Sequence, residues 1–447
     1  MRSLVKDVVP DIQALTNIPD ERMPTYRAPF ADILPRNLAR LVAVAMIGTA
    51  LAVGAALLWL TYQDVYAGFV WDDAYYLLMA DRYSPYAADP SPVLTEIIGT
   101  RNFPPLYPLL LAVAGAGSAA IGRAHLVTTG CALIALTLFY FWLGTLGVRP
   151  VARWVATLAL ALAPITLMHL PVLWSEHLYL ALTMGVLLAV SRADTRPGGR
   201  NLAALLVALA ALTRVAGVSL VGAFAVYALW RWRRRGILPA LLATLPVFAE
   251  RTINTLVSHS GSNYHSHGWA FITSQDILHL AMRQLASLYA AWERVMALEP
   301  GPLAAWTAVL LMAPLTLGIL SRLRHGQLDG IYVVCYGALL LCFWDLPQQG
   351  PRLIYGIFPV LVGQMLHGAG QLLPHRSTHA ATAFAVLMFA LLAAPAAAQM
   401  AARMAYPAPP GLEPGLDHRS GRRVNKRSAV HRIPRRRWWT ALRLSTL

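Results

Sequence analysis

The sequence predicts a single all-α polytopic membrane domain with about 11–12 transmembrane helices and interfacial helices in its first outer loop. Composition, the recurrence of apolar segments and the placement of the arginines lead to this prediction. Of the 447 residues, 57% are hydrophobic and 13% are charged, and the mean hydropathy is +0.52. Since a soluble globular protein carries about 25% charged residues, the composition excludes a soluble enzyme of this length.

Three segments organise the chain. Residues 1–40 are mixed and polar, which predicts a cytoplasmic segment without a cleaved signal peptide. Residues 41–398 form the membrane domain, whose first outer loop is 61–122. Residues 399–447 combine a Pro-rich linker with a basic tail, in which 418–447 hold ten Lys and Arg and no acid. We expect this tail to be disordered and solvated, with binding to anionic lipid or nucleic acid as the alternative.

The expected membrane crossings follow the apolar runs. Residues 41–60 supply 20 nearly uninterrupted apolar residues, about the length that a helix needs to span roughly 30 Å of hydrocarbon. The further expected spans are 125–146, 151–169, 177–190, 202–212, 215–230, 237–249, 303–320, 328–343, 353–366 and 382–398.

Arginine placement predicts the sidedness, because Arg and Lys favour cytoplasmic loops. One orientation makes four arginine-rich connections cytoplasmic, at 149–153, 192–200, 231–235 and 322–324. The outer side then holds 61–122, 174–176, 213–214, 251–302 and 344–352. In this topology the apolar stretch 104–121 is an interfacial or re-entrant helix. A full crossing there would invert the sidedness of everything after it.

Two adjacent carboxylates, Asp72 and Asp73, follow the first crossing and lead into an amphipathic helix. Adjacent like charges raise each other's proton affinity, and partial burial adds to the effect. Such a pair is a candidate general base. The alternative is that Asp72 caps the helix and Asp73 interacts with its dipole.

Arginines near the predicted outer surface are candidate phosphate ligands. Arg101 precedes a Pro-Pro pair, and Tyr107 of the same motif is a candidate substrate contact. Arg352 is expected to start a late helix from the outer side. For both arginines the alternative is an ordinary anchor at the membrane interface.

Glu176 and Arg214 are ionisable groups at the edges of apolar runs. Glu176 lies in a turn at the predicted outer mouth, where it either lines a cavity or caps the next helix. Arg214 carries an insertion penalty of up to roughly 2.5 to 3.5 kcal/mol if it lies at membrane depth, so it needs a partner. A phosphate is one such partner, and a buried pair with Glu176 or Asp72 is the alternative.

Arg251 is a further candidate substrate ligand, and the polar outer stretch after it contains His259, His265 and His267. Their spacing matches no specific metal site, so we expect histidines that are solvated or contact substrate. The three cysteines of the chain all lie in apolar runs, which leaves neither a disulfide framework nor a zinc-binding spacing. We predict no cofactor, and no motif supports a divalent metal.

The order of these motifs resembles that of the integral-membrane glycosyltransferases of the GT-C type, in particular the branch with the protein O-mannosyltransferases and the bacterial aminoarabinose transferases. The resemblance covers about 41–398. Its best-matching patterns are Asp72-Asp73-x-Tyr75-Tyr76 and Thr213-Arg214-x-x-Gly217. The resemblance implies that the acidic pair supplies the catalytic base, with Asp72 matching the catalytic member and Asp73 in place of the usual Glu.

Two departures from the family pattern matter. A Lys often directly precedes the Pro-Pro motif and meets the donor phosphate, whereas Phe103 stands there in this chain and Arg101 lies two residues earlier. We also expect no counterpart of the large outer C-terminal domain of some members, which leaves the acceptor open.

The resemblance implies transfer of a sugar, with inversion, from a polyprenyl-phosphate donor to an acceptor hydroxyl of a lipid, glycan or protein. The expected location is the cell (inner) membrane, with the site on the extracytoplasmic side and with membrane lipids, not nucleic acid, as partners. No glycine-rich phosphate loop is visible, which argues against a nucleotide-sugar donor. The alternatives are a secondary transporter or flippase for a lipid-linked or anionic substrate, and a noncatalytic membrane scaffold.

Overall fold

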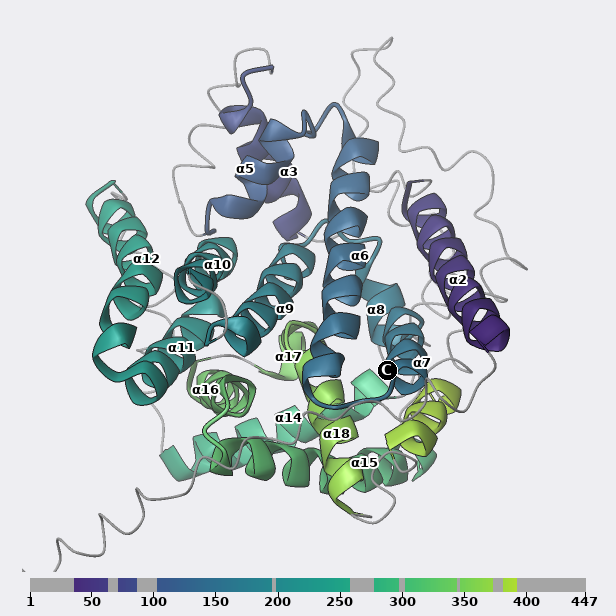
Figure 1. The fold of residues 1–447 in the computed structure, drawn as a ribbon. Coiled ribbons are helices and arrows are strands. Elements are labelled where there is room, and N and C mark those ends of the chain that lie inside the picture. The colour runs from purple at the N-terminus through teal and green to yellow at the C-terminus, as the bar shows by residue number, and fades with distance from the viewer. Residues whose placement is uncertain are drawn as a thin grey trace, which may run out of the picture. The chain divides into compact units, whose positions relative to one another are not determined.

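All the secondary structure that the structure describes is helical (Figure 1). This computed structural model describes residues 36–62, 71–86, 103–194, 198–257, 277–296, 302–343, 346–372 and 381–391. The helices are α2 (Arg36–Tyr62), α3 (Trp71–Tyr83), α5 (Leu106–Val113), α6 (Ile121–Thr145), α7 (Pro150–Ala161), α8 (Pro164–His169), α9 (Glu176–Arg192), α10 (Gly199–Thr213), α11 (Gly217–Trp232), the 3-10 helix η1 (Arg233–Gly236), α12 (Ile237–Val257), α14 (Ile277–Met296), α15 (Pro302–Arg324), α16 (Leu328–Phe343), α17 (Leu346–Tyr355), α18 (Phe358–Leu372) and a final helix, Ala381–Leu391. The predicted all-α class is confirmed for these residues.

The chain divides into two units, 1–51 and 52–447. The first is described only through the N-terminal part of α2. The second holds all the other helices and every contact discussed below. The predicted tail, 399–447, lies outside the described residues, and the predicted domain boundaries stay predictions.

Among the described helices, α6 is long and apolar enough to cross a membrane by length and composition. α17 and α18 pass the same test as a pair bent by 65°. The other apolar helices are shorter, namely Val44–Trp59, Pro150–Ala161, Gly199–Thr213, Leu328–Leu341 and Ala381–Leu391. The predicted number of 11–12 crossings therefore stays a prediction.

Helices α9, α10 and α11 run back and forth, and α10 packs against both of the others. Glu176 at the start of α9 and Arg214 just after α10 consequently meet at one end of this three-helix unit. The turn between α10 and α11 needs Gly217, because a Cβ atom there would lie 2.5 Å from the Cα atom of Ala211. The sequence pattern that contains Arg214 and Gly217 is thus a tight turn that fixes the arginine.

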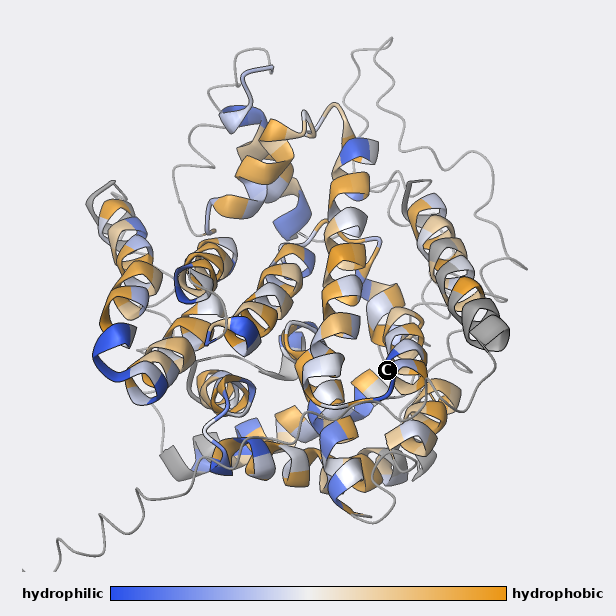
Figure 2. Ribbon diagram, viewed as in Figure 1, coloured by the Kyte–Doolittle hydropathy of each residue, from blue (hydrophilic) through white to orange (hydrophobic). Residues whose placement is uncertain are grey.

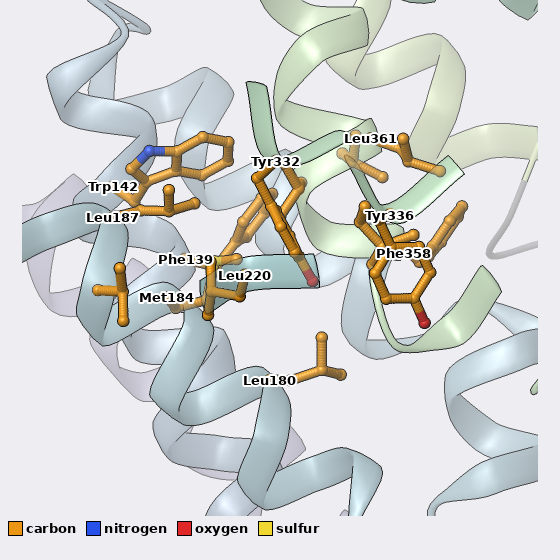
Figure 3. Close-up of a cluster of buried hydrophobic side chains, with 14 of the residues drawn as sticks. Phe139, Trp142, Leu180, Met184, Leu187, Leu220, Tyr332, Tyr336, Phe358 and Leu361 are labelled. Carbon is orange, nitrogen blue, oxygen red and sulfur yellow. The ribbon is translucent and has the colours of Figure 1, made fainter. Parts of the chain in front are cut away.

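The main core lies where α6, α9, α11, α16 and α18 meet (Figure 3). Phe139, Met184, Leu220, Tyr332 and Phe358 are all fully buried in it. Large apolar side chains also remain exposed: Phe248 is 65% and Leu310 70% exposed. The helices accordingly carry apolar residues on both inner and outer faces (Figure 2). Large exposed apolar surface of this kind marks a membrane or protein contact.

Several predicted boundaries are wrong, each for a local reason. The predicted span 151–169 breaks into α7 and α8 at Pro164, which occupies the first turn of α8. The predicted span 353–366 breaks between Tyr355 and Phe358, where α17 ends and α18 begins. The stretch 251–302 contains all of α14 and the last turns of α12, while its predicted location on the outer side stays a prediction.

The segment 104–121 contains only one short helix, α5, which has eight residues. At 1.5 Å per residue this helix is about 12 Å long, far less than the roughly 30 Å of a bilayer core. α5 packs against α3 and is followed by turns that lead into α6. The helix of this segment is therefore too short to cross a bilayer core on its own, and its predicted interfacial or re-entrant placement stays a prediction.

Candidate active site

The acidic pair lies in the first turn of α3. The helix begins at Trp71, so Asp72 is a helical residue and the interpretation of Asp72 as the N-cap is wrong. The two side chains differ in environment, because that of Asp72 is 20% exposed and Asp73 is 1% exposed. A first-turn position favours a negative charge on either carboxylate.

Arg352 joins the acidic pair to a residue of another helix. Its Nη1 donates to Oδ2 of Asp72 at 2.5 Å, and its Nε donates to Oε1 of Glu176. Its guanidinium also lies over the ring of Trp174, 4.1 Å from the ring centroid. Arg352 occupies the last turn of α17, at the break before α18, whereas the sequence predicted it at the start of a helix.

Glu176 is fully buried and binds two arginines through one oxygen. Its Oε1 accepts from Arg352 and forms an ion pair with Nη1 of Arg214, while its Oε2 has no partner among the described residues. The cap interpretation of this turn is wrong, since α9 has no side-chain cap and the Ser175 hydroxyl instead bonds to that of Tyr76 at 3.0 Å.

Arg214 has an extended backbone (φ −154°, ψ 141°) directly after α10. Its side chain is 10% exposed, and its Nε has no partner among the described residues. The pair with Glu176 that the sequence offered as an alternative is therefore present. Since Nε is not used by Glu176, the pair does not exclude a phosphate role for Arg214.

Asp73 is the least exposed acid of the pair, and its Oδ1 has no partner within the described chain. Burial, aided by the neighbouring charge of Asp72, raises the pKa of Asp73 to about 7, although a backbone hydrogen bond from Leu173 acts to lower it. Near neutral pH this carboxyl is therefore only partly ionised. Asp72 and Glu176 then balance the charges of Arg214 and Arg352.

Tyr76, which lies on the same helix as Asp72 and Asp73, is packed against Tyr107. Tyr107 is fully buried, and its ring meets that of Tyr76 edge-on at 4.9 Å between centroids. Its hydroxyl bonds to Oγ1 of Thr128 at 2.7 Å. In this structure Tyr107 positions Tyr76, and its predicted contact with substrate stays a prediction.

Sequence reasoning missed the residues that hold Arg352. Trp174 lies beneath the guanidinium, and the His169 ring packs between Trp174 and Tyr355 at centroid distances of 4.9 and 4.7 Å. The sequence could have indicated Trp174, because this residue belongs to the predicted outer turn 174–176. No sequence pattern indicated His169 and Tyr355, because both lie inside predicted spans.

Some predicted residues cannot be compared with the site. Arg101 and the three loop histidines, His259, His265 and His267, lie outside the described residues. Arg251 belongs to helix α12, not to a loop, and its side chain is outside the described part. Their predicted roles stay predictions.

The arrangement combines two chemical capacities. Arg214 and Arg352, largely shielded from water, are suited to binding an anion through charge-assisted hydrogen bonds. Asp72, partly exposed beside them, can accept a proton once its hydrogen bond to Arg352 is released. Four groups from four separate segments of the chain thus form one site for an anionic substrate and a proton-donating one.

No protein-family model matches the chain, and neither does any curated protein. One solved structure has a similar arrangement of helices, the crystal structure of ArnT from Cupriavidus metallidurans bound to undecaprenyl phosphate. It is 14% identical, the match covers 81% of this chain and 79% of that one, and the TM-score is 0.48. At that level of similarity the function rests on the geometry of the site.

Proposed function

We propose that the chain is an integral-membrane glycosyltransferase that transfers a sugar from a polyprenyl-phosphate donor to an acceptor hydroxyl at the outer face of the membrane. The observation that carries this proposal is the cluster of Asp72, Glu176, Arg214 and Arg352. It unites the acidic pair and the arginines that the motif resemblance singled out, although they are far apart in the sequence.

The leaving group explains why two buried arginines are needed. A sugar linked to polyprenyl phosphate is a phosphodiester with one negative charge, and the departing polyprenyl phosphate carries one more. Preorganised donors that meet charge as it develops typically contribute about 10² to 10³ in rate. Glu176 serves as the counter-ion that keeps Arg214 and Arg352 together when no phosphate is bound. Arg101, whose position before the Pro-Pro pair suits a lipid phosphate, and Arg251 are proposed as further substrate ligands.

Asp72 is the proposed general base. It takes the proton of the acceptor hydroxyl as the oxygen bonds to the anomeric carbon, and the bond from that carbon to the phosphate oxygen breaks on the opposite side, with inversion. Arg352 donates a hydrogen bond to Asp72 at 2.5 Å. A donor phosphate competes for the same guanidinium, so donor binding frees the base. The reaction uses no cofactor.

The decisive experiment measures product. The purified protein is incubated with labelled polyprenyl-phosphate sugars and membrane extracts, and label is followed into a new glycosylated acceptor. Asp81→Asn is the matched control for Asp72→Asn, because Asp81 lies on the same helix and instead accepts a hydrogen bond from the Ser118 backbone N–H at 3.1 Å. Transfer by the wild type and Asp81→Asn, together with its loss in Asp72→Asn, supports the proposal. Unchanged transfer in Asp72→Asn contradicts it.

A transporter or flippase is the second candidate, and one observation favours it. One helix break carries a charged residue of the site, Arg352 at the 65° bend between α17 and α18. Discontinuous helices with charged groups at the break are typical of transporters. In sealed liposomes a flippase would move a fluorescent polyprenyl-phosphate sugar across the bilayer without an acceptor, whereas the enzyme would form product only when the acceptor is added.

A further inference from the structure

A second cluster of charged residues lies at the opposite end of the α9–α11 unit from Glu176. It surrounds a cavity of about 550 Å³ that is lined by five arginines, Asp194 and Trp232. Helix α9 has 17 residues, so the two ends are about 25 Å apart along its axis. This cavity, which we call the arginine pocket, shares no residue with the candidate active site.

One wall of the arginine pocket is formed by side chains that contact one another around Asp194. Trp232 is buried and its Nε1 donates to Oδ1 of Asp194 at 3.2 Å. Arg200 lies over the Trp232 ring at 5.3 Å and 3.5 Å from the same carboxylate oxygen. Arg231 approaches the other oxygen at 3.8 Å. Asp194 thereby orients two of the arginines while remaining half exposed.

The other wall is the short helix η1, which carries Arg233, Arg234 and Arg235. Arg233 has φ of 50°, and it is the one non-glycine residue with positive φ among those the structure describes. η1 folds tightly back on α11, because a Cβ atom on Gly236 would lie 2.0 Å from the Ala228 carbonyl oxygen. Backbone strain of this kind is found where the fold presents functional groups. The three arginines are therefore displayed by a defined turn.

The charge of the arginine pocket is not balanced within the described chain. Asp194 is its one acidic lining residue against five arginines, an excess of four positive charges. Arg233, Arg234 and Arg235 are exposed and form no ion pair with any described residue. The turn between α11 and α12 is correspondingly hydrophilic (Figure 2). Concentrated charge of one sign attracts an anion of the opposite sign.

Apolar side chains flank the arginines directly. Val226 and Trp230 near the end of α11 are 52% and 63% exposed, and Ile237 and Leu238 at the start of α12 are 49% and 58% exposed. These apolar side chains would make no favourable contact with a free inorganic ion. They match the acyl chains of a lipid whose headgroup reaches the arginines.

We propose that the arginine pocket binds the phosphate group of an anionic lipid headgroup, in the leaflet opposite to the one that holds the candidate active site. Guanidinium groups match phosphate geometry through paired hydrogen bonds, and basic pockets between membrane helices bind anionic headgroups. The inference does not depend on the proposed transfer reaction, since it uses none of the residues of the candidate active site.

The test compares lipids and variants on the purified full-length protein in nonionic detergent. The midpoint of thermal unfolding is followed during titration with phosphatidic acid, phosphatidylcholine or inorganic phosphate. We expect phosphatidic acid alone to raise the midpoint of the wild type. Arg234→Gln should weaken the apparent affinity by about tenfold, the effect of losing one charge-assisted hydrogen bond. Arg234→Lys should be intermediate.

Arg324→Gln is the matched control, because Arg324 is exposed at the end of α15 and does not line the pocket. It removes the same charge and should leave the lipid titration unchanged. Equal weakening by Arg324→Gln, or equal stabilisation by phosphatidylcholine, would overturn the proposal. If inorganic phosphate raised the unfolding midpoint as much as phosphatidic acid does, the ligand would be free phosphate, and the proposal of a lipid headgroup would be overturned. Because Arg234 is exposed, the lipid-free midpoints of all variants should agree, which separates binding from folding.

Discussion

Arg352 and Asp72 are 280 positions apart in the sequence and are joined by a hydrogen bond of 2.5 Å. The same guanidinium binds Glu176, so one side chain ties the first-turn acid of α3 to the start of α9. A ligand that draws Arg352 towards itself changes the surroundings of both acids at once.

Asp72→Asn should keep the fold and lose turnover by about 10² or more, because an amide cannot accept the proton that a general base removes. Asp73→Asn should be milder. Both are measured as initial rates of sugar transfer at saturating donor. The two variants are needed together because adjacent carboxylates titrate as a unit, and near-normal rates in both would end the catalytic assignment.

Glu176→Gln should destabilise the protein by about 3 to 5 kcal/mol, since it leaves two buried arginines without their shared counter-charge. Polyprenyl phosphate should restore part of this loss in the unfolding midpoint, because a bound ligand stabilises the folded state. Asp329→Asn is the control. Asp329 is also buried and paired, with Arg322 at 2.9 Å, but lies outside the site. Equal rescue of both variants would show that the lipid acts nonspecifically.

Arg214→Lys should lower donor affinity while the folded amount stays near normal. Lysine keeps the charge that pairs with Glu176 but loses the two-edged hydrogen bonding of a guanidinium. Binding of a labelled polyprenyl-phosphate sugar and the yield of folded protein are measured side by side. Poor accumulation combined with normal binding by the remaining protein would assign Arg214 a structural role only.

Asp73 predicts a pH dependence of stability. Its pKa is about 7 when folded and about 3.9 in an unfolded chain, so between these values the folded state holds a proton that the unfolded state has lost. Stability then falls as pH rises from about 4 to 7. Asp73→Asn should flatten this part of the profile in denaturant titrations across that range. A profile identical to that of the wild type would exclude a raised pKa.

Sidedness can be tested with new cysteines at two exposed positions, Tyr86 and Arg324. An impermeant thiol reagent added to intact cells should label Tyr86→Cys and leave Arg324→Cys unlabelled, because the arginine-rich connections are predicted to be cytoplasmic. The unsubstituted protein gives the background from the native cysteines. The reverse labelling pattern would invert the topology.

The sequence was sufficient for the helical class and for singling out the charged residues that the structure brings together, Asp72, Glu176, Arg214 and Arg352, since apolar runs and isolated charges are local features. The sequence was not sufficient to predict which of these charged residues pair with one another. That Glu176 is shared by Arg214 and Arg352 depends on how α9, α10 and α17 pack, which no local pattern encodes. Helix α14 was missed for a different reason: it carries charged residues such as Arg283, Glu293 and Arg294 along its length, so its hydropathy resembles that of a loop.

Gly217 has no functional group, yet it begins α11 in the turn that follows Arg214, and its backbone N–H donates to the Arg214 carbonyl. Substitution of Gly217 should therefore be as harmful as substitution of an active-site residue. A methyl group there meets the backbone of Ala210 and Ala211 at 2.5 to 2.7 Å, so α10 and α11 must move apart and carry the guanidinium with them. In a comprehensive substitution library, position 217 would therefore score with the ionisable residues of the site and not with loosely packed glycines such as Gly130 and Gly222, where an added Cβ atom would meet nothing within 4 Å. A ranking of positions by tolerance alone would list it among the catalytic groups.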